Sequence, residues 1–179
     1  MALFFVIINF NKFLGQNPLG YRAPQGVIKL EDLDLLLDNG YSFSSSIFPS
    51  YRLGKFNNLR MPIMPFLWNN GLLEIPFAVI PGIRLIYSLS YIKLFSLSIS
   101  KALTTMFGLP NVVVIDSHLH DLFYSPDSLK KVNGLPRYAW SIRKNDGQKY
   151  LNKIIEYLKL NDYEFVSISD LYKILKVNI

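Results

Sequence analysis

The spacing of apolar residues predicts helices and strands that alternate along the chain. Residues 27–41, VIKLEDLDLLLDNGY, carry apolar residues at helical spacing and end at Asn39-Gly40, which is typical of a helix C-terminus. The run YSFSSSIFP, residues 41–49, alternates polar and apolar positions and therefore predicts a half-buried strand that Pro49 closes. Residues 50–71 contain prolines, glycines and asparagines without sustained periodicity, so we expect a long irregular loop there.

The rest of the chain continues this alternation. We expect a strand pair or bulged strand at residues 72–82, a helix at 85–107 that ends at Gly108-Leu109-Pro110, and a strand at 111–117, NVVVIDS, buried on both faces. The following segments predict a helix at 147–160 capped by Asp146, a short buried strand at 163–168, and a last helix, LYKILK, that starts at Ser169 or Asp170. The alternation favours an α/β class, in layers or a barrel.

Composition narrows the functional classes. The 179 residues are half hydrophobic, which favours a single domain over residues 1–179. The absence of cysteine excludes disulfides, thiolate nucleophiles and Cys-based zinc sites. The net charge of +6 comes from scattered Lys and Arg residues, so we expect no nucleic-acid partner.

Two apolar segments bear on membranes and targeting. The first ten residues, expected to form a buried strand or helix, are too short a run to span a bilayer and lack the basic leader of a signal peptide. Lys93 and Lys101 interrupt residues 85–107, which therefore also predict no membrane span. The compartment stays undetermined, with the cytoplasm as the default.

Both histidines of the chain lie in IDSHLHDLF, residues 115–123. On a strand, Asp116, His118 and His120 point to one side and form a possible metal site. A second hypothesis makes one imidazole a general acid, because that role needs one positioned nitrogen that titrates near neutral pH. A third leaves the histidines as a polar strand end in water. In α/β folds, ligands bind at the C-terminal ends of the strands, where this segment would lie.

Further candidate residues lie in the first half. Arg22 stands between Tyr21 and Ala23-Pro24, and a stiffened backbone would hold its guanidinium ready to orient a carboxylate; the alternative is a surface arginine beside a turn. Trp68 and Glu74 could line a sugar-binding groove, although Trp68 could equally plug the loop.

Taken in order, these motifs resemble the C-terminal part of the polysaccharide deacetylase family, the carbohydrate esterases with a NodB-type domain. GYRAPQGVIKLEDLDLLLDNGYSFSSSIFPS is similar to its Arg-x-Pro motif with the following helix and strand, and GLLEIPFAVIPG to its Leu-x-Glu-Ile-Pro strand. VVVIDSHLHDLF resembles the strand that carries the catalytic histidine, and LNKIIEYLKLNDYEFVSISDLYKIL the end of the domain. The likeness covers residues 19–176.

The resemblance implies a distorted (β/α) barrel that binds a divalent metal, usually zinc, and removes N-acetyl groups from a carbohydrate. It makes Arg22 the residue that orients an aspartate base. His118 becomes the acid in one register and His120 in the other, with His118 favoured. Tyr21, Pro24, Trp68 and Glu74 become substrate-binding residues.

The chain also departs from the family pattern. Residues 1–20 contain no Asp, Glu or His, where the family has its Asp-Asp pair and His-x-x-x-His segment. Gln25 replaces the usual aromatic residue and Ser44 an aspartate. We therefore expect an incomplete barrel without the base or the zinc ligands, inactive alone, with the true start in question. An open sheet edge would invite a partner chain or a homo-oligomer. The alternative is a non-catalytic carbohydrate-binding or assembly module.

Overall fold

The computed structural model describes residues 10–124, 127, 130, 137–138 and 141–177. The chain divides into two compact units. The first unit consists of residues 1–76 and 165–179, and the second unit of residues 77–164. The element expected at the N-terminal apolar run lies mostly outside the described residues. Each unit is described by itself, and the single domain over residues 1–179 stays a prediction.

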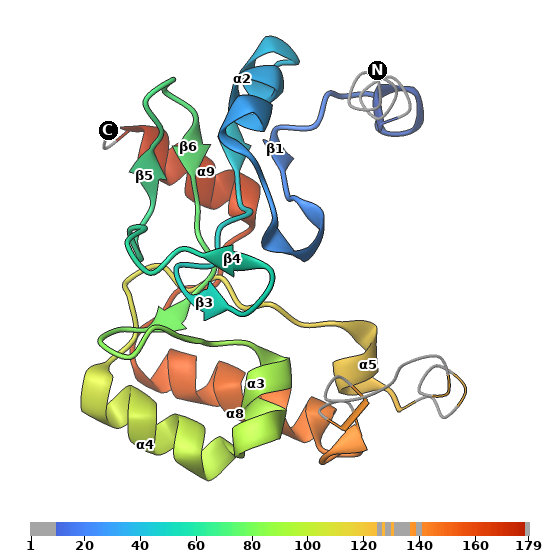
Figure 1. The fold of residues 1–179 in the computed structure, drawn as a ribbon, viewed down its shortest axis with the longest axis vertical. Coiled ribbons are helices and arrows are strands. Elements are labelled where there is room, and N and C mark those ends of the chain that lie inside the picture. The colour runs from blue at the N-terminus through green and yellow to red at the C-terminus, as the bar shows by residue number, and fades with distance from the viewer. Residues whose placement is uncertain (1–9, 125–126, 128–129, 131–136, 139–140, 178–179) are drawn as a thin grey trace. The chain divides into compact units, whose positions relative to one another are not determined.

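The first unit contains a four-stranded sheet with the order β1-β2-β6-β5 (Figure 1). Strands β1 (Gly20–Tyr21), β2 (Phe43–Ser44) and β6 (Leu73–Glu74) are parallel, and β5 (Phe66–Leu67) runs antiparallel to β6. The C-terminal ends of the three parallel strands therefore meet at one edge of this sheet. Ligands of α/β proteins usually bind at such an edge.

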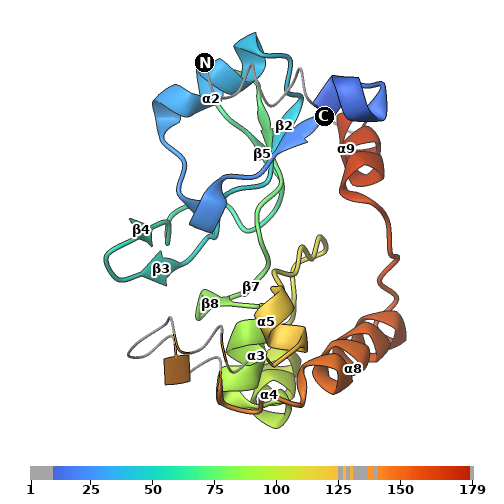
Figure 2. The same ribbon diagram turned by 90° about the vertical axis from the view of Figure 1, so that its right-hand side faces the viewer.

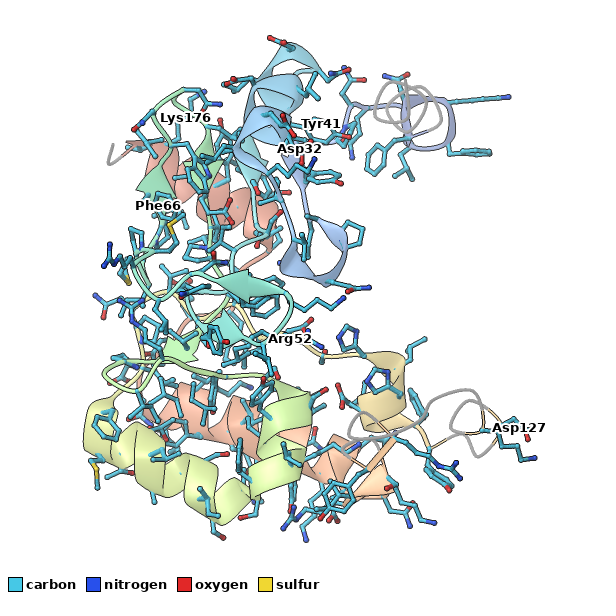
Figure 3. The ribbon with its side chains drawn as sticks, viewed as in Figure 1. Asp32, Tyr41, Arg52, Phe66, Asp127 and Lys176 are labelled. Carbon is cyan, nitrogen blue, oxygen red and sulfur yellow. The ribbon has the colours of Figure 1, made fainter. Side chains whose placement is uncertain are left out.

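Helix α2 (Leu30–Asp38) follows a short 3-10 turn, η1 (Pro24–Gly26). Leu33 and Leu36 on its apolar face form a buried cluster with Tyr41 and Leu72. Tyr41 is labelled in Figure 3. The helix ends as the sequence predicts. Its C-cap is Asn39, and Gly40 takes a φ of 80°, a conformation that glycine adopts without steric cost.

Strand β2 lies within the run where a strand was predicted, but residues 41–50 are almost all buried, so the expected half-burial was wrong. Ser44, Ser45 and Ser46 are each 0–1% exposed. They are buried because their hydroxyl groups have partners: Ser44 Oγ donates to Ser46 Oγ at 2.9 Å, and the amide of Ala23 donates to Ser46 Oγ at 2.9 Å. Hydrogen bonding offsets the cost of burying these polar groups.

The expectation of an irregular loop at residues 50–71 was also wrong in part. Strands β3 (Tyr51–Arg52) and β4 (Phe56–Asn57) form an antiparallel hairpin, and β5 joins the four-stranded sheet. Phe48 stacks on Phe56 with ring centroids 5.9 Å apart. The short strands have too few residues to produce a visible period in the sequence.

The first unit ends with helix α9 (Ile168–Val177), which starts one residue before the predicted Ser169. Ser167, just before the helix, caps its first turn, because its Oγ accepts a hydrogen bond from the amide of Asp170 at 3.1 Å. The Tyr172 ring stacks on Phe43 with centroids 5.3 Å apart. The buried strand predicted at 163–168 was wrong. Within the described chain these residues have no strand partner, and Phe165 is 53% exposed.

The second unit is mainly helical (Figure 2). Among the described residues its elements include β7 (Val79–Ile80), β8 (Leu85–Ile86), α3 (Leu89–Phe95), α4 (Leu97–Phe107), α5 (Leu119–Leu122) and α8 (Gly147–Leu160). Strands β7 and β8 pair antiparallel, and α3 packs against α4, α5 and α8. The core of this unit includes Leu89, Ile92 and Ile154, each at most 2% exposed. Asp146 precedes α8 at the predicted cap position, but its side chain makes no capping hydrogen bond.

One prediction for this unit was wrong in part and another was wrong. The helix expected at 85–107 begins at Leu89 and breaks at Ser96, whose φ of 91° lies outside the helical region. The strand expected at 111–117 is half-buried and pairs weakly. Among the described residues, its ladder is limited to a parallel bridge between Ser88 and Asp116, and Val114 O accepts from the amide of Ala78.

The described residues thus form a mixed α/β structure whose small sheets stay open. A deacetylase-type barrel stays a prediction for this chain. Over the described part of the sequence, no helix has the length and apolar character needed to cross a membrane.

Candidate functional site

The candidate proton donor, His118, lies beside a carboxylate in the second unit. Its Nε2 is 3.3 Å from Asp116 Oδ2, and its side chain is 55% exposed. The backbone places both groups: Asp116 forms the parallel bridge to Ser88, and His118 is the N-cap of α5. A carboxylate at this distance holds an imidazole in one orientation. An exposed, oriented imidazole can transfer a proton to or from a bound molecule.

A buried carboxylate, Asp121, supports the backbone of His118. Asp121 is 1% exposed, and its Oδ2 accepts a hydrogen bond from the amide of His118 at 3.1 Å. The Ser90 hydroxyl lies 2.8 Å from Oδ1 and 2.7 Å from Oδ2 of the same carboxylate. Lys93 Nζ lies 3.9 Å from Asp121 Oδ1 and donates to the Asp121 carbonyl oxygen at 3.2 Å. Two side chains of α3 therefore hold Asp121.

The charge state of this cluster follows from burial. Burial lowers the pKa of Lys93 from its ordinary value, while the nearby carboxylates of Asp121 and Asp146 raise it. Burial also lowers the pKa of His120, against the opposing charge of Asp121. His120 therefore favours its neutral form more than a histidine in water does.

The two histidines lie close together but differ in exposure. Their rings stack with centroids 4.9 Å apart and an interplanar angle of 19°. The His120 side chain is 28% exposed, about half the exposure of His118, and its Nε2 lies 4.0 Å from Asp121 Oδ1. Exposure thus agrees with His118 as the more accessible acid, and the choice between the two registers stays a prediction.

The metal hypotheses require several ligand side chains to lie close together. Among the described residues, no group of three or more His, Cys, Asp and Glu side chains could hold a metal ion. Asp116, His118 and His120 do not form such a group in this structure. The described residues therefore do not fit the zinc that the family resemblance implies.

In the first unit, Arg22 follows strand β1 and is held by the loop after β2. Its Nε donates to the carbonyl oxygen of Ser45 at 3.0 Å, and its Nη2 donates to Ser45 Oγ at 2.9 Å. The residue is exposed at the sheet edge where the parallel strands end. These contacts with Ser45 orient the guanidinium. The predicted role of Arg22 in orienting a carboxylate stays a prediction.

Glu74 lies at the same edge but is 0% exposed. Its Oε1 accepts hydrogen bonds from the amides of Ser46 at 2.7 Å and Ile47 at 2.9 Å. Its Oε2 accepts from Trp68 Nε1 at 3.3 Å. The Glu74 carboxylate therefore binds the backbone of the loop after β2. Its contact with a substrate stays a prediction.

The remaining candidates also lie in the first unit. The Tyr21 ring meets Tyr41 edge-on with centroids 5.8 Å apart. The Trp68 ring meets Phe66 edge-on at 5.0 Å (Phe66 is labelled in Figure 3). Pro24 is exposed at the start of η1. Arg22 belongs to the first unit and His118 to the second. The joint role that the family resemblance implies for them stays a prediction.

Sequence reasoning missed the roles of several residues. Lys93 and Lys101 both interrupt one apolar run in the sequence, but in the structure Lys93 is buried beside Asp121 while Lys101 is exposed. Asp121 follows His120 directly, but the local sequence does not indicate that its carboxylate is buried. Nothing in the local pattern pairs Ser90 with a residue 31 positions away.

No protein-family model matches the chain, and no curated protein or solved structure matches it significantly.

Proposed function

We propose that the chain is a polysaccharide-deacetylase-like protein in which His118 donates a proton during removal of an N-acetyl group from a carbohydrate. The order of the motifs around Arg22, Glu74 and His118 in the sequence supports the proposal. The geometric observation that carries it is the half-exposed His118 imidazole with Asp116 Oδ2 3.3 Å from its Nε2.

In the proposed reaction the two nitrogens of His118 have different roles. Nε2 lies 3.3 Å from Asp116 Oδ2, and this carboxylate would keep the ring in one orientation. Nδ1 is then the nitrogen that delivers a proton to the leaving amine. A positioned acid of this kind contributes roughly 10²–10⁴-fold to rate.

Arg22 is the second residue with a role in the proposed reaction. Arg22 presents its guanidinium from the sheet edge and binds or orients an anionic group there. Zinc, when bound in proteins of this family, polarises the acetyl carbonyl and activates water. Because the described residues do not fit the metal, no step of the present reaction is assigned to it.

The experiment measures acetate release from oligomers of N-acetylglucosamine by the full chain, with and without added Zn²⁺. His118→Asn is expected to lower the rate by roughly 10²-fold or more. His120→Asn, which alters the neighbouring imidazole, serves as the matched variant and should lower it less. Acetate release that His118→Asn leaves unchanged rejects the deacetylase proposal. A wild type that releases no acetate even with Zn²⁺ favours the second candidate, carbohydrate binding without catalysis.

A second candidate function is carbohydrate binding without catalysis. The observation that favours it is the exposed hairpin of residues 51–57, where Tyr51 is 51% and Leu53 is 84% exposed. Exposed aromatic rings stack on sugar faces. A titration with the same oligomers, followed by NMR, should show binding that Tyr51→Ala weakens and Tyr138→Ala, at a tyrosine of similar exposure, leaves unchanged. Binding without acetate release supports this candidate over the first.

A further inference from the structure

We infer that Ser90 and Lys93 of helix α3 are positioning residues for His118 and act through the buried carboxylate of Asp121. The importance of this positioning for a reaction rests on the proposed function. The contacts that carry the inference are geometric and do not depend on that function.

The first anchor of the His118 turn is Asp116. Its carbonyl oxygen accepts a hydrogen bond from the amide of Leu89 at 3.0 Å, and its backbone forms the parallel bridge to Ser88. Both partners lie at the start of α3. The carboxylate that faces the imidazole is therefore attached to the first turn of this helix.

The second anchor is Asp121, on the other side of the same turn. The Ser90 hydroxyl binds its carboxylate at 2.7–2.8 Å, and Lys93 Nζ binds its carbonyl oxygen at 3.2 Å. Asp121 Oδ2 in turn accepts from the amide of His118 at 3.1 Å. The side chains of α3 thus reach the backbone of His118 through one carboxylate.

Neighbouring segments leave Asp121 and α3 little freedom to move. A Cβ atom added to Gly147 of α8 would collide with the carbonyl oxygen of Asp121, so the two backbones are in close contact. Arg143 Nη1 donates to the carbonyl oxygens of Lys93 at 2.6 Å and Leu94 at 3.0 Å, at the end of α3. Helix α3 is therefore a fixed support for both sides of the turn at residues 117–120.

This arrangement predicts an effect that ordinary destabilisation does not. Loss of the Ser90 hydroxyl should loosen Asp121, shift the amide of His118 and separate its imidazole from Asp116. A purely structural role for the Ser90–Lys93–Asp121 cluster would lower the free energy of unfolding and leave the His118 imidazole unchanged in molecules that stay folded.

The experiment records imidazole ¹⁵N spectra of the full chain labelled at histidine, at one fixed pH. His118→Asn assigns the signals, and Asp116→Asn gives the spectrum of an imidazole without its carboxylate. Ser90→Ala and Lys93→Met are expected to move the His118 signals toward those of Asp116→Asn. Ser90→Thr, which keeps the hydroxyl, is expected to restore them. Lys153→Met, at an exposed ion pair of the same unit, is the control.

A folded Ser90→Ala variant with His118 signals identical to those of the wild type overturns the inference. Ser90→Ala removes one oxygen atom and gives the decisive result if Lys93→Met does not fold. Where the wild type releases acetate, the displaced imidazole should also cost about 10²-fold in rate. The spectra test the positioning and the acetate assay tests the proposed function, so the two failures are distinguishable.

Discussion

The ammonium group of Lys93 lies 3.9 Å from the carboxylate of Asp121, and both side chains are at most 1% exposed. Removing two charges from water costs several kcal/mol each, and their attraction offsets this cost only when further hydrogen bonds are made. The Ser90 hydroxyl and the Asp121 carbonyl oxygen supply such bonds. The stability of the second unit should therefore depend on keeping both charges together.

Lys93→Met is expected to destabilise the protein by about 3–5 kcal/mol, because it leaves the Asp121 charge buried without its cation. Lys153→Met breaks an exposed pair with Glu156 and should cost less than about 1 kcal/mol. Urea denaturation followed by circular dichroism measures both. An equal decrease in the free energy of unfolding of the two variants would show that the buried pair contributes no more to stability than the exposed one.

Glu74→Gln is expected to destabilise the first unit by about 1.5–3 kcal/mol, since hydrogen bonds to a charged acceptor are lost. A glutamine side chain has one oxygen atom, which accepts hydrogen bonds, and one NH₂ group, which does not. Either the backbone amides of Ser46 and Ile47 or the Trp68 indole would therefore lose its acceptor and face the NH₂ group. Glu31→Gln, at an exposed carboxylate, is the matched control. The measurement is again the free energy of unfolding, and similar values for both variants would reject the organising role of Glu74.

The free energy of unfolding should fall as the pH drops below the ordinary histidine value of about 6.5. Burial lowers the pKa of His120 in the folded protein, so between that lowered pKa and 6.5 the unfolded chain binds more protons than the folded one. Stability then rises with pH across this window. Urea denaturation at pH 7.5 and at lower pH should show the loss in the wild type and a smaller loss in His120→Asn. A pH dependence that His120→Asn leaves unchanged would assign the effect to other groups.

Gly147→Ala should destabilise the second unit by about 1–3 kcal/mol, because the added methyl group would collide with the Asp121 carbonyl oxygen. Alanine normally favours a helix over glycine by up to about 1 kcal/mol, so the sign is opposite to helix propensity. Gln148→Ala changes the next, exposed residue of α8 and should stay within about 0.5 kcal/mol of the wild type. Thermal denaturation of both variants provides the comparison, and a stabilised Gly147→Ala would contradict the close contact.

The helices were largely predictable because their signals are local. Residues 30–38 combine an apolar stripe with an Asn-Gly end, and the structure ends α2 there. The stripe at 147–160 likewise predicts the bounds of α8. The break at Ser96 was not predictable, because a serine with a φ of 91° contradicts local preference and is held by its surroundings.

The strands were predicted less well because pairing depends on distant segments. Residues 111–117 and 163–168 have strand composition, but a strand needs a partner that composition does not reveal. The candidate site divides in the same way. His118 and Arg22 were found as reactive residue types, whereas the contacts of Ser90 and Lys93 with Asp121 arise from tertiary packing alone.

Helix α3 is only seven residues long, and in isolation a peptide of that length would be mostly unwound in water. Its first turn is joined to Asp116 through Leu89, and its last carbonyl oxygens bind Arg143. Fraying, which usually begins at helix ends, is therefore opposed at both of them. Amide hydrogens of α3 should therefore exchange with solvent as slowly as those of much longer helices. This short helix would then be among the last segments of the second unit to unfold.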